Sequence, residues 1–238
     1  IARPATPVQM NGYRKGAALR FARYTAVWSP GRYKMYLTKI DLSHLQRDIR
    51  RRLGDCQQFH QMIMGLFGCD RKSAGVLYRV REDRNTLAVY LYSNRPISRE
   101  HLLPGMHISG QRDVTLWLES MKPGQVWHFD LLASPTKKVE QDGTKNSRRR
   151  ILRTLEERIA WLAKKGVQNG FQLISCQELG GGQITGRHIQ ERGGRMYLDQ
   201  YHYQGTLQIT DAEQFQKAVQ EGIGPGKSYG LGMLLLNP

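Results

Sequence analysis

A glycine-rich run near the C-terminus carries residue types suited to holding a phosphate group. Its glycines and polar residues are Gly222, Gly224, Gly226, Lys227, Ser228, Gly230 and Gly232. Glycines let backbone amides approach an anion closely, and the lysine adds a positive charge. A nucleotide-binding P-loop is disfavoured, because three residues separate Gly222 from Gly226 where that motif needs four. We predict a loop that grips nucleic-acid phosphates; the alternative is a turn that only caps a helix.

A second candidate segment is strongly basic. Between residues 137 and 153 it contains Lys137, Lys138, Lys145, Arg148, Arg149, Arg150 and Arg153. We expect the three consecutive arginines to open a helix and fan out around it, as suits contacts with both phosphate walls of a groove. Cations at the positive end of a helix dipole cost some stability, which favours a functional role. The alternative is a basic helix start that is merely solvated.

His60 is the third candidate. It follows Phe59 in an apolar stripe, so it can lie at the edge of a cleft. Imidazole titrates near neutral pH and suits the proton transfers to and from a 2′-hydroxyl and a leaving oxygen that RNA cleavage requires. The alternative is a packing or surface residue. The seven histidines and three cysteines form no HExxH motif, CxxC pair or Cys/His cluster, so no zinc site is predicted.

The elements that must position these residues begin with a β-α-β-β-α-β pattern, the ferredoxin-like order, in the first half of the chain. An apolar stripe from Phe59 to Phe67 predicts a helix, and alternating apolar residues predict strands. The expected elements are a strand (35–41), two helices (45–53 and 57–67), two strands (76–81 and 86–93), a short helix (98–103) and a strand (114–120).

The second half follows the same order after a predicted domain boundary at Lys122-Pro-Gly124. The expected elements are a strand (126–133), a helix (151–165) ended by Gly166, two strands around Gly180–Gly182, a strand (203–209), a helix opened by a capping box at Thr210-x-x-Glu213 and ending at Glu221, and a strand (233–236). The expected fold class is therefore α+β, with two tandem ferredoxin-like (RRM-like) domains at 35–122 and 125–238.

Composition favours a polyanionic partner. The chain has 238 residues, enough for two small domains, and its 36 Lys and Arg against 20 Asp and Glu give a formal net charge of +16. Basic surfaces gain affinity for nucleic acid by releasing condensed counterions. A charge kept for solubility and a membrane-surface role are the alternatives. No apolar run reaches the roughly 20 residues that span a bilayer and no signal pattern is visible, so the expected location is the cytoplasm.

Residues 1–34 form a separate basic extension. They contain Lys and Arg but no acidic residue, and they show no sustained periodicity. We expect this segment to become ordered on a partner, along an RNA or against a neighbouring subunit. A disordered tail or the remnant of a fusion is the alternative.

Several collinear segments resemble one known family. They are the start Met35-Tyr-Leu-Thr-Lys-Ile40, Ala133-Ser-Pro-Thr-Lys137, Ile159-Ala-Trp-Leu162, and the ending formed by residues 203–211 and 222–232. With these segments the chain resembles the CasE family, the repeat-processing endoribonuclease subunit of type I-E CRISPR Cascade. The resemblance covers about Met35 to Pro238.

The resemblance implies metal-independent cleavage of the repeat hairpin in pre-crRNA, on the 3′ side of the stem, without a cofactor. The 2′-oxygen attacks the adjacent phosphorus and leaves a 2′,3′-cyclic phosphate and a 5′-hydroxyl. The implied partners are CRISPR RNA and the other Cascade subunits, including the backbone subunit nearest the crRNA 3′ end, with target DNA involved only indirectly. His60 falls on the family's catalytic histidine, and Lys137 and the Arg148–Arg150 region would face the RNA stem.

Gln57 departs from the family pattern, which often places a tyrosine three residues before the histidine. A carboxamide can form hydrogen bonds but cannot shuttle a proton. His60 acting alone, help from another residue, and a scaffold that holds the crRNA hairpin with weak or no cleavage are therefore all open. An unrelated basic RNA- or ribosome-associated protein is a further alternative.

Overall fold

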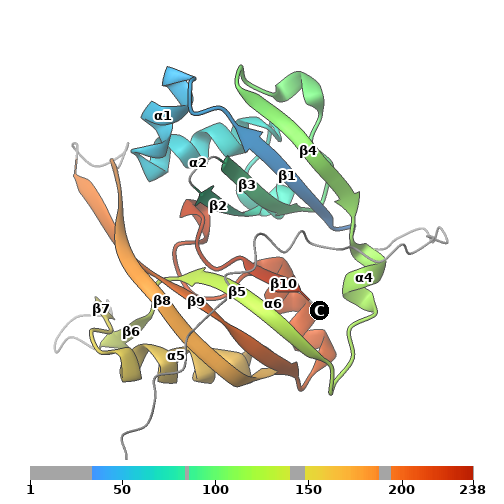
Figure 1. Cartoon of the computed structure of the whole chain (residues 1–238), viewed down its shortest axis with the longest axis vertical. Helices are drawn as coiled ribbons and strands as arrows, with labels where there is room; N and C mark the ends of the chain where they lie inside the picture. Colours follow the sequence, from blue (N-terminus) through green and yellow to red (C-terminus); the bar gives the residue numbers. More distant parts are fainter. Residues whose placement is uncertain (1–33, 84–85, 140–147, 188–193, 238) are drawn as a thin grey trace, which may run out of the picture.

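Two four-stranded antiparallel sheets form the framework of the protein (Figure 1). The computed structural model describes residues 34–83, 86–139, 148–187 and 194–237. The strand orders are β2-β3-β1-β4 and β10-β5-β9-β8. When the four strands of each sheet are numbered along the chain, both orders are 4-1-3-2, which is the ferredoxin-like arrangement. The prediction of two tandem ferredoxin-like domains is confirmed.

The N-terminal domain has a helical layer with its own core. Its elements are β1 (Tyr36–Leu42), α1 (Arg47–Leu53), α2 (Cys56–Gly65), α3 (Arg71–Ala74), β2 (Leu77–Asp83), β3 (Thr86–Ser93), η1 (Arg99–His101), β4 (Met106–Asp113) and α4 (Thr115–Glu119). The predicted apolar stripe of α2 is buried and joins Ile40 and Val89 of the sheet in one core. The Asp55 side chain accepts hydrogen bonds from the first amides of α2 and so sets where that helix begins.

The end of this domain differs from the expectation. The prediction of a strand at 114–120 is wrong: most of these residues form the short helix α4, and the strand is the preceding β4. Val114 and Leu118 are buried four residues apart, which is helical spacing. β4 lies at the edge of the sheet and is largely exposed, so it lacks the alternating apolar pattern that reveals a strand. The helix expected at 98–103 is a single 3₁₀ turn, η1.

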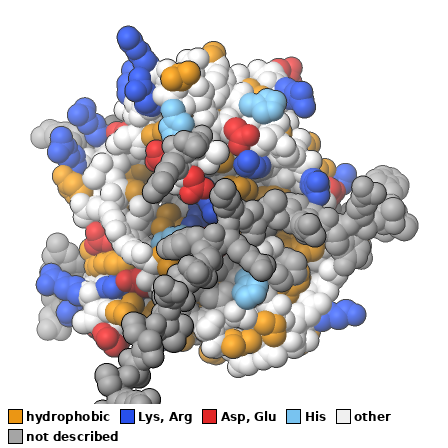
Figure 2. All heavy atoms as spheres, in the orientation of Figure 1, with side chains coloured by type: hydrophobic (Ala, Val, Ile, Leu, Met, Phe, Trp, Pro, Cys, Tyr) orange, Lys and Arg blue, Asp and Glu red, His pale blue; other side chains and the backbone are white. Residues whose placement is uncertain are grey.

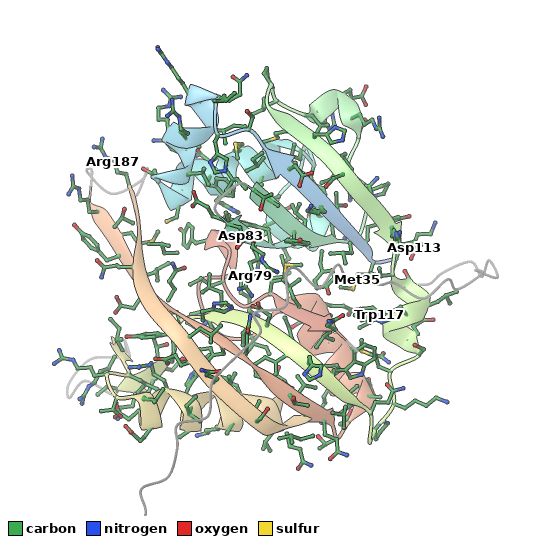
Figure 3. All side chains as sticks on the ribbon, viewed as in Figure 1. Met35, Arg79, Asp83, Asp113, Trp117 and Arg187 are labelled. Carbon is green, nitrogen blue, oxygen red and sulfur yellow. The ribbon has the colours of Figure 1, made fainter. Side chains whose placement is uncertain are left out.

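The C-terminal domain carries α5 (Leu155–Gln168), the longest helix of the described residues, and a long β-ribbon. Its elements are β5 (Val126–Ala133), β6 (Thr136–Val139), β7 (Arg148–Ile151), α5 (Leu155–Gln168), β8 (Phe171–Arg187), β9 (Arg195–Ile209), α6 (Ala212–Glu221), η2 (Lys227–Tyr229) and β10 (Leu234–Asn237). β6 and β7 pair only with each other. β8 and β9 extend beyond the sheet, and the far end of β8 reaches α2 of the other domain (Figures 1 and 3).

Three expectations for this domain need correction. The chain does not break at Gly180–Gly182, because β8 runs through them: Gly181 lies against the ring of Tyr201, where a side chain would not fit. Gly166 does not end α5 but lies inside it against Phe171, and the helix ends at Gln168 with Asn169 as its C-cap. The cap of α6 is Asp211, one residue after the predicted Thr210.

One hydrophobic core joins the two domains. Leu37, Leu77 and Tyr92, on the face of the first sheet that turns away from its helices, belong to the same cluster as Leu131 and Tyr203 of the second. The shared core fixes the two domains relative to each other. The predicted division at 122–124 stays a prediction, as does a role for the extension, of which all but Lys34 lies outside the described residues.

An ion pair reinforces this junction. Arg79 of β2, labelled in Figure 3, pairs with Asp130 of β5, and a ring nitrogen of His202 lies 3.0 Å from the same carboxylate. Both partners of the pair are largely buried, so each charge depends on the other. Within the described part of the chain, none of the helices has the length and apolar character needed to cross a membrane.

Candidate active site and nucleic-acid interface

The glycine-rich run lies at the junction of the two domains. Its middle forms η2, which contacts both α2 and β2 of the N-terminal domain. The Tyr78 hydroxyl of β2 donates a hydrogen bond to the backbone carbonyl of Ser228, 2.8 Å away. On the other side, Gly224 lies directly against the ring of Trp161 in α5. Both domains therefore hold the run in place.

The ends of the run are fastened within the protein. Ile223 donates its amide to the carbonyl of Gly232, and Gly232 donates its own amide to Leu132, at 2.8 and 2.7 Å. Gly232 has a φ of +84°, and a Cβ there would lie 2.6 Å from the Ile223 carbonyl oxygen, so only glycine fits. The Gly222 amide is also used, by Ala218. The amides at both ends of the run are therefore engaged within the protein, which leaves its middle, residues 224–230, as the part that a phosphate could meet.

Lys227 lies where two basic grooves meet. One groove, of about 700 Å³, runs between α5, α6 and β6; the other, of about 720 Å³, runs between α6 and α3. The cations that line them are Lys34, Arg71, Lys72, Lys138, Lys165, Lys217 and Lys227. The acidic residues that line them are Glu213 and Glu221. The two grooves form a positive path across the helical layers of both domains.

The charge of Lys227 lacks full compensation inside the protein. Burial lowers the pKa of its ammonium group, and the charges of Arg71 and Lys165 lower it further, against an opposing effect of Glu221. A cation in this position is stabilised when an anion binds beside it. The predicted phosphate contact of Lys227 fits this environment.

His60 lies on α2 beside the glycine-rich run. Its ring meets the ring of Tyr229 edge-on, with centroids 6.1 Å apart. Burial lowers the pKa of His60, and the positive charge of Arg71 lowers it further, so the imidazole is neutral at pH 7 and can accept a proton. Its Nδ1 is buried and has no hydrogen-bond partner among the described residues. An unsatisfied buried nitrogen of this kind calls for a functional explanation.

Gln57 lies one helical turn before His60, on the same side of α2. Its Oε1 accepts a hydrogen bond from the Tyr229 hydroxyl, at 3.1 Å. The two α2 residues singled out from the sequence therefore both face the glycine-rich run. Tyr229 was not predicted as a site residue, although it stands inside the run.

The arginines at 148–150 do not open a helix, and this prediction is wrong. They lie in β7, and α5 begins only at Leu155. Thr154 accepts a hydrogen bond from the Glu157 amide, and the Glu157 carboxylate accepts from the Thr154 amide; this capping box ends the preceding structure. The spacing Thr-x-x-Glu was the sequence signal that marks the true start. These arginines therefore do not oppose the dipole of α5, since they lie outside that helix.

The basic segment is instead a β-hairpin. Lys137 pairs with Arg150 and Lys138 with Arg149 across β6 and β7. Its exposed cations, with that of the following turn, are Lys137, Lys138, Arg150 and Arg153. Like charges placed opposite each other destabilise a strand pair, which favours a polyanion as their partner. Figure 2 shows Lys and Arg side chains gathered at the edge of the molecule where Figure 1 draws this hairpin. Lys145 lies outside the described residues.

Fold and site together define a two-domain ferredoxin-like protein with a histidine and a basic path at the domain junction. The model of the CRISPR associated protein family matches residues 35–238, and the chain belongs to this family. The CRISPR-associated endoribonuclease Cse3 of Thermus thermophilus is 25% identical over 224 residues, which cover 86% of this chain and 100% of that protein. The resemblance to the CasE family is confirmed.

Solved structures agree with this family. Cse3 bound to a 19-nucleotide RNA superposes with a TM-score of 0.76 at 25% identity, over 86% of this chain and 100% of that one. A chain of a CRISPR RNA-guided surveillance complex in a pre-nicking state gives 0.64 at 27% identity, over 85% and 99%. Cas6e of Escherichia coli strain K-12 gives 0.63 at 24% identity, over 85% and 99%.

Proposed function

We propose that this protein is a metal-independent endoribonuclease that cleaves CRISPR repeat hairpins in pre-crRNA and then stays bound to the crRNA 3′ hairpin as a subunit of type I-E Cascade. The observation that carries the proposal is the neutral His60 beside the glycine-rich run, whose Lys227 lines both basic grooves. The similarity to Cse3, solved with RNA, and to a chain of a surveillance complex supports it.

The chemistry follows from the protonation state of His60. The neutral imidazole accepts the proton of the 2′-hydroxyl while the 2′-oxygen attacks the adjacent phosphorus. The bond from phosphorus to the 5′-oxygen breaks, and that oxygen takes up a proton, so the products are a 2′,3′-cyclic phosphate and a 5′-hydroxyl. Lys227 and the middle of the run stabilise the negative charge that develops on the phosphate oxygens.

Binding of the hairpin falls to the C-terminal domain. The exposed cations of the β6–β7 hairpin, with Arg153, would hold the RNA stem by its phosphates. The groove beside α5 and α6 would lead the strand to Lys227. The other Cascade subunits, including the backbone subunit nearest the crRNA 3′ end, are the protein partners of this function, target DNA is met only indirectly, and the cytoplasm is its location.

The experiment is single-turnover cleavage of the cognate repeat hairpin in EDTA, with mass analysis of the RNA ends. We expect one cut at the base of the stem that leaves a cyclic phosphate. His60→Ala should slow it by roughly 10²- to 10⁴-fold without weakening hairpin binding. His128→Ala, which changes a histidine of a different groove, is the matched control. Equal cutting by His60→Ala and wild type would refute the assignment of His60.

A second function is favoured by one observation, the carboxamide at position 57 next to His60. A protein without an efficient proton-transfer pair would serve mainly as a scaffold that holds the guide hairpin. Tight binding of the repeat hairpin with no cut in the same assay would support this function over the first.

A further inference from the structure

The Tyr229 hydroxyl and the Gln57 carboxamide form a contact that joins the glycine-rich run to the helix of His60. The donor is the phenol and the acceptor is Oε1, 3.1 Å away. Burial raises the pKa of Tyr229, and the neighbouring Cys56 adds to the effect, so the phenol stays protonated at neutral pH and keeps its role as donor.

The position of Tyr229 is set by the run itself. Its amide donates a hydrogen bond to the carbonyl of Gly226, and the preceding carbonyl, of Ser228, accepts from Tyr78. Gly226 and Gly230 flank η2 with left-handed backbone, φ +82° at both. The phenol is therefore presented to α2 by a backbone that only glycine at these places can form.

Fixing one end of a carboxamide fixes the other. When Oε1 of Gln57 is held by the phenol, the two N–H groups of Nε2 must point away from Tyr229. Among the described residues, this nitrogen has no hydrogen-bond partner. It lies one helical turn from His60, on the side of α2 that faces η2, so its two donors are free for a ligand.

We propose that Gln57 binds a non-bridging oxygen of the scissile phosphate through Nε2, and that Tyr229 is the positioning residue that orients it. This inference rests on the proposed ribonuclease function and deepens it. A carboxamide transfers no proton, so the pair stabilises charge on the phosphate and leaves the proton transfer to His60. The phenol that holds the Gln57 carboxamide also contacts the His60 imidazole edge-on, so the carboxamide and the imidazole lie beside the same tyrosine ring.

A purely structural tyrosine would behave differently on substitution. Tyr229→Phe keeps the ring and removes only the hydroxyl, so it leaves the contact with His60 intact. Gln57→Glu keeps an oxygen that can accept from Tyr229 but replaces the N–H donors by a carboxylate that repels phosphate. If the contact between Tyr229 and Gln57 is only structural, Gln57→Glu should keep cleavage activity. If Tyr229 orients the N–H donors of Gln57 toward the phosphate, Gln57→Glu should lose that activity.

The test is single-turnover cleavage of the repeat hairpin in EDTA by Tyr229→Phe, Gln57→Leu, Gln57→Glu and the double variant Tyr229→Phe/Gln57→Leu. We expect about a tenfold loss of rate for Tyr229→Phe and about a hundredfold loss for Gln57→Glu. Hairpin affinity should change only a few-fold, because many other phosphate contacts hold the RNA, and the shape of the pH profile should be unchanged. The double variant should be no slower than Gln57→Leu, since Tyr229 acts through Gln57. Tyr90→Phe, a half-buried tyrosine of a different groove, is the control.

The outcomes distinguish failure of the Tyr229–Gln57 pair from failure of the proposed ribonuclease function. Wild-type rates for Tyr229→Phe or Gln57→Glu, while His60→Ala is inactive, would overturn the orienting pair alone. Losses that multiply in the double variant would overturn the action of Tyr229 through Gln57. A wild-type protein that binds the hairpin but leaves it uncut would overturn the ribonuclease function and the pair with it.

Discussion

The two domains share one strand order but differ in their helices and in how their cores are enclosed. In the N-terminal domain three short helices, α1 to α3, cover one face of the sheet and enclose a core that belongs to this domain alone. In the C-terminal domain two helices, α5 and α6, accompany the sheet, and its core continues into the first domain. His60, the residue proposed for proton transfer, stands on the first domain, whereas Lys227 and the basic β6–β7 hairpin stand on the second.

Under the proposed function, one topology serves chemistry and binding at once. The buried apolar stripe of α2, the helix of His60, packs into the core of the N-terminal domain. The position of α2 therefore does not depend on the basic surface. The glycine-rich run belongs to the second domain by sequence but contacts α2 and β2 of the first. Substitutions in the two domains should therefore separate cleavage from binding, and the following predictions test that separation.

The largest effect is expected for charge reversal in the C-terminal groove. Lys165→Glu/Lys217→Glu/Lys227→Glu should weaken hairpin binding by a factor on the order of 100 or more and reduce the salt dependence by about one unit for each lysine that contacts a phosphate. Hairpin titrations at several salt concentrations measure both quantities.

The matched control reverses three exposed charges outside both grooves, Arg95→Glu/Arg99→Glu/Lys122→Glu. It changes net charge by the same amount and should leave affinity within a few-fold of wild type. If the two triple variants bind equally weakly, overall charge and not the groove determines binding.

The pH dependence of cleavage reports on the N-terminal domain. Because the pKa of His60 lies below its usual value of 6.5, the neutral base persists at pH 7 and is lost only as the pH falls below that lowered pKa. The single-turnover rate should be flat above pH 7 and should fall about tenfold per pH unit on the acid side. A rate that keeps rising from pH 7 to 9 would point to a base other than His60, provided hairpin binding is constant over that range.

The ion pair between the domains sets their joint stability. Asp130→Asn should destabilise the protein by about 3 kcal/mol at pH 7, because it leaves the buried Arg79 charge unpaired. Burial would raise the pKa of Asp130, but the hydrogen bond from His202 and the charge of Arg79 outweigh it and lower the pKa to about 2.

A depressed carboxyl pKa contributes stability above its unfolded value near 4 and loses it as the pH falls toward 2. Denaturant unfolding at pH 7 and pH 3 should therefore show a smaller difference between Asp130→Asn and wild type at the lower pH. The exposed Asp83→Asn serves as the control, with little change at either pH. A pH-independent difference would assign the stabilisation to something other than this carboxylate.

The smallest expected effect concerns the glycine-rich run. Gly232→Ala should cost about 2 kcal/mol, since its left-handed backbone and the nearby Ile223 carbonyl leave no room for a methyl group. Gly110→Ala on β4, where a methyl would meet nothing within 4 Å, should change stability little. Thermal unfolding of the two variants measures whether the end of the run at Gly232 contributes to stability. Equal unfolding midpoints for Gly232→Ala and Gly110→Ala would contradict that contribution.

The sequence alone determined the elements that have a strong periodic signal and the charge of the molecule. The apolar stripe from Phe59 to Phe67 and the alternation in β2 and β3 reflect burial, and burial is what binary patterns record. The glycine-rich run and its likeness to one family were also visible, because each is a continuous local string of residues. His60 and Gln57 were visible as neighbours on one helix.

Only the tertiary structure decided the exposed strands and the site itself. β4 and β7 carry little apolar residue pattern because they are an edge strand and half of an exposed hairpin, so their partners, not their composition, make them strands. The contact of Tyr229 with Gln57 and His60 joins residues far apart in the chain, and no local pattern encodes such a distance. The shared core between the domains brings them together, because burying the second face of the first sheet requires the other domain.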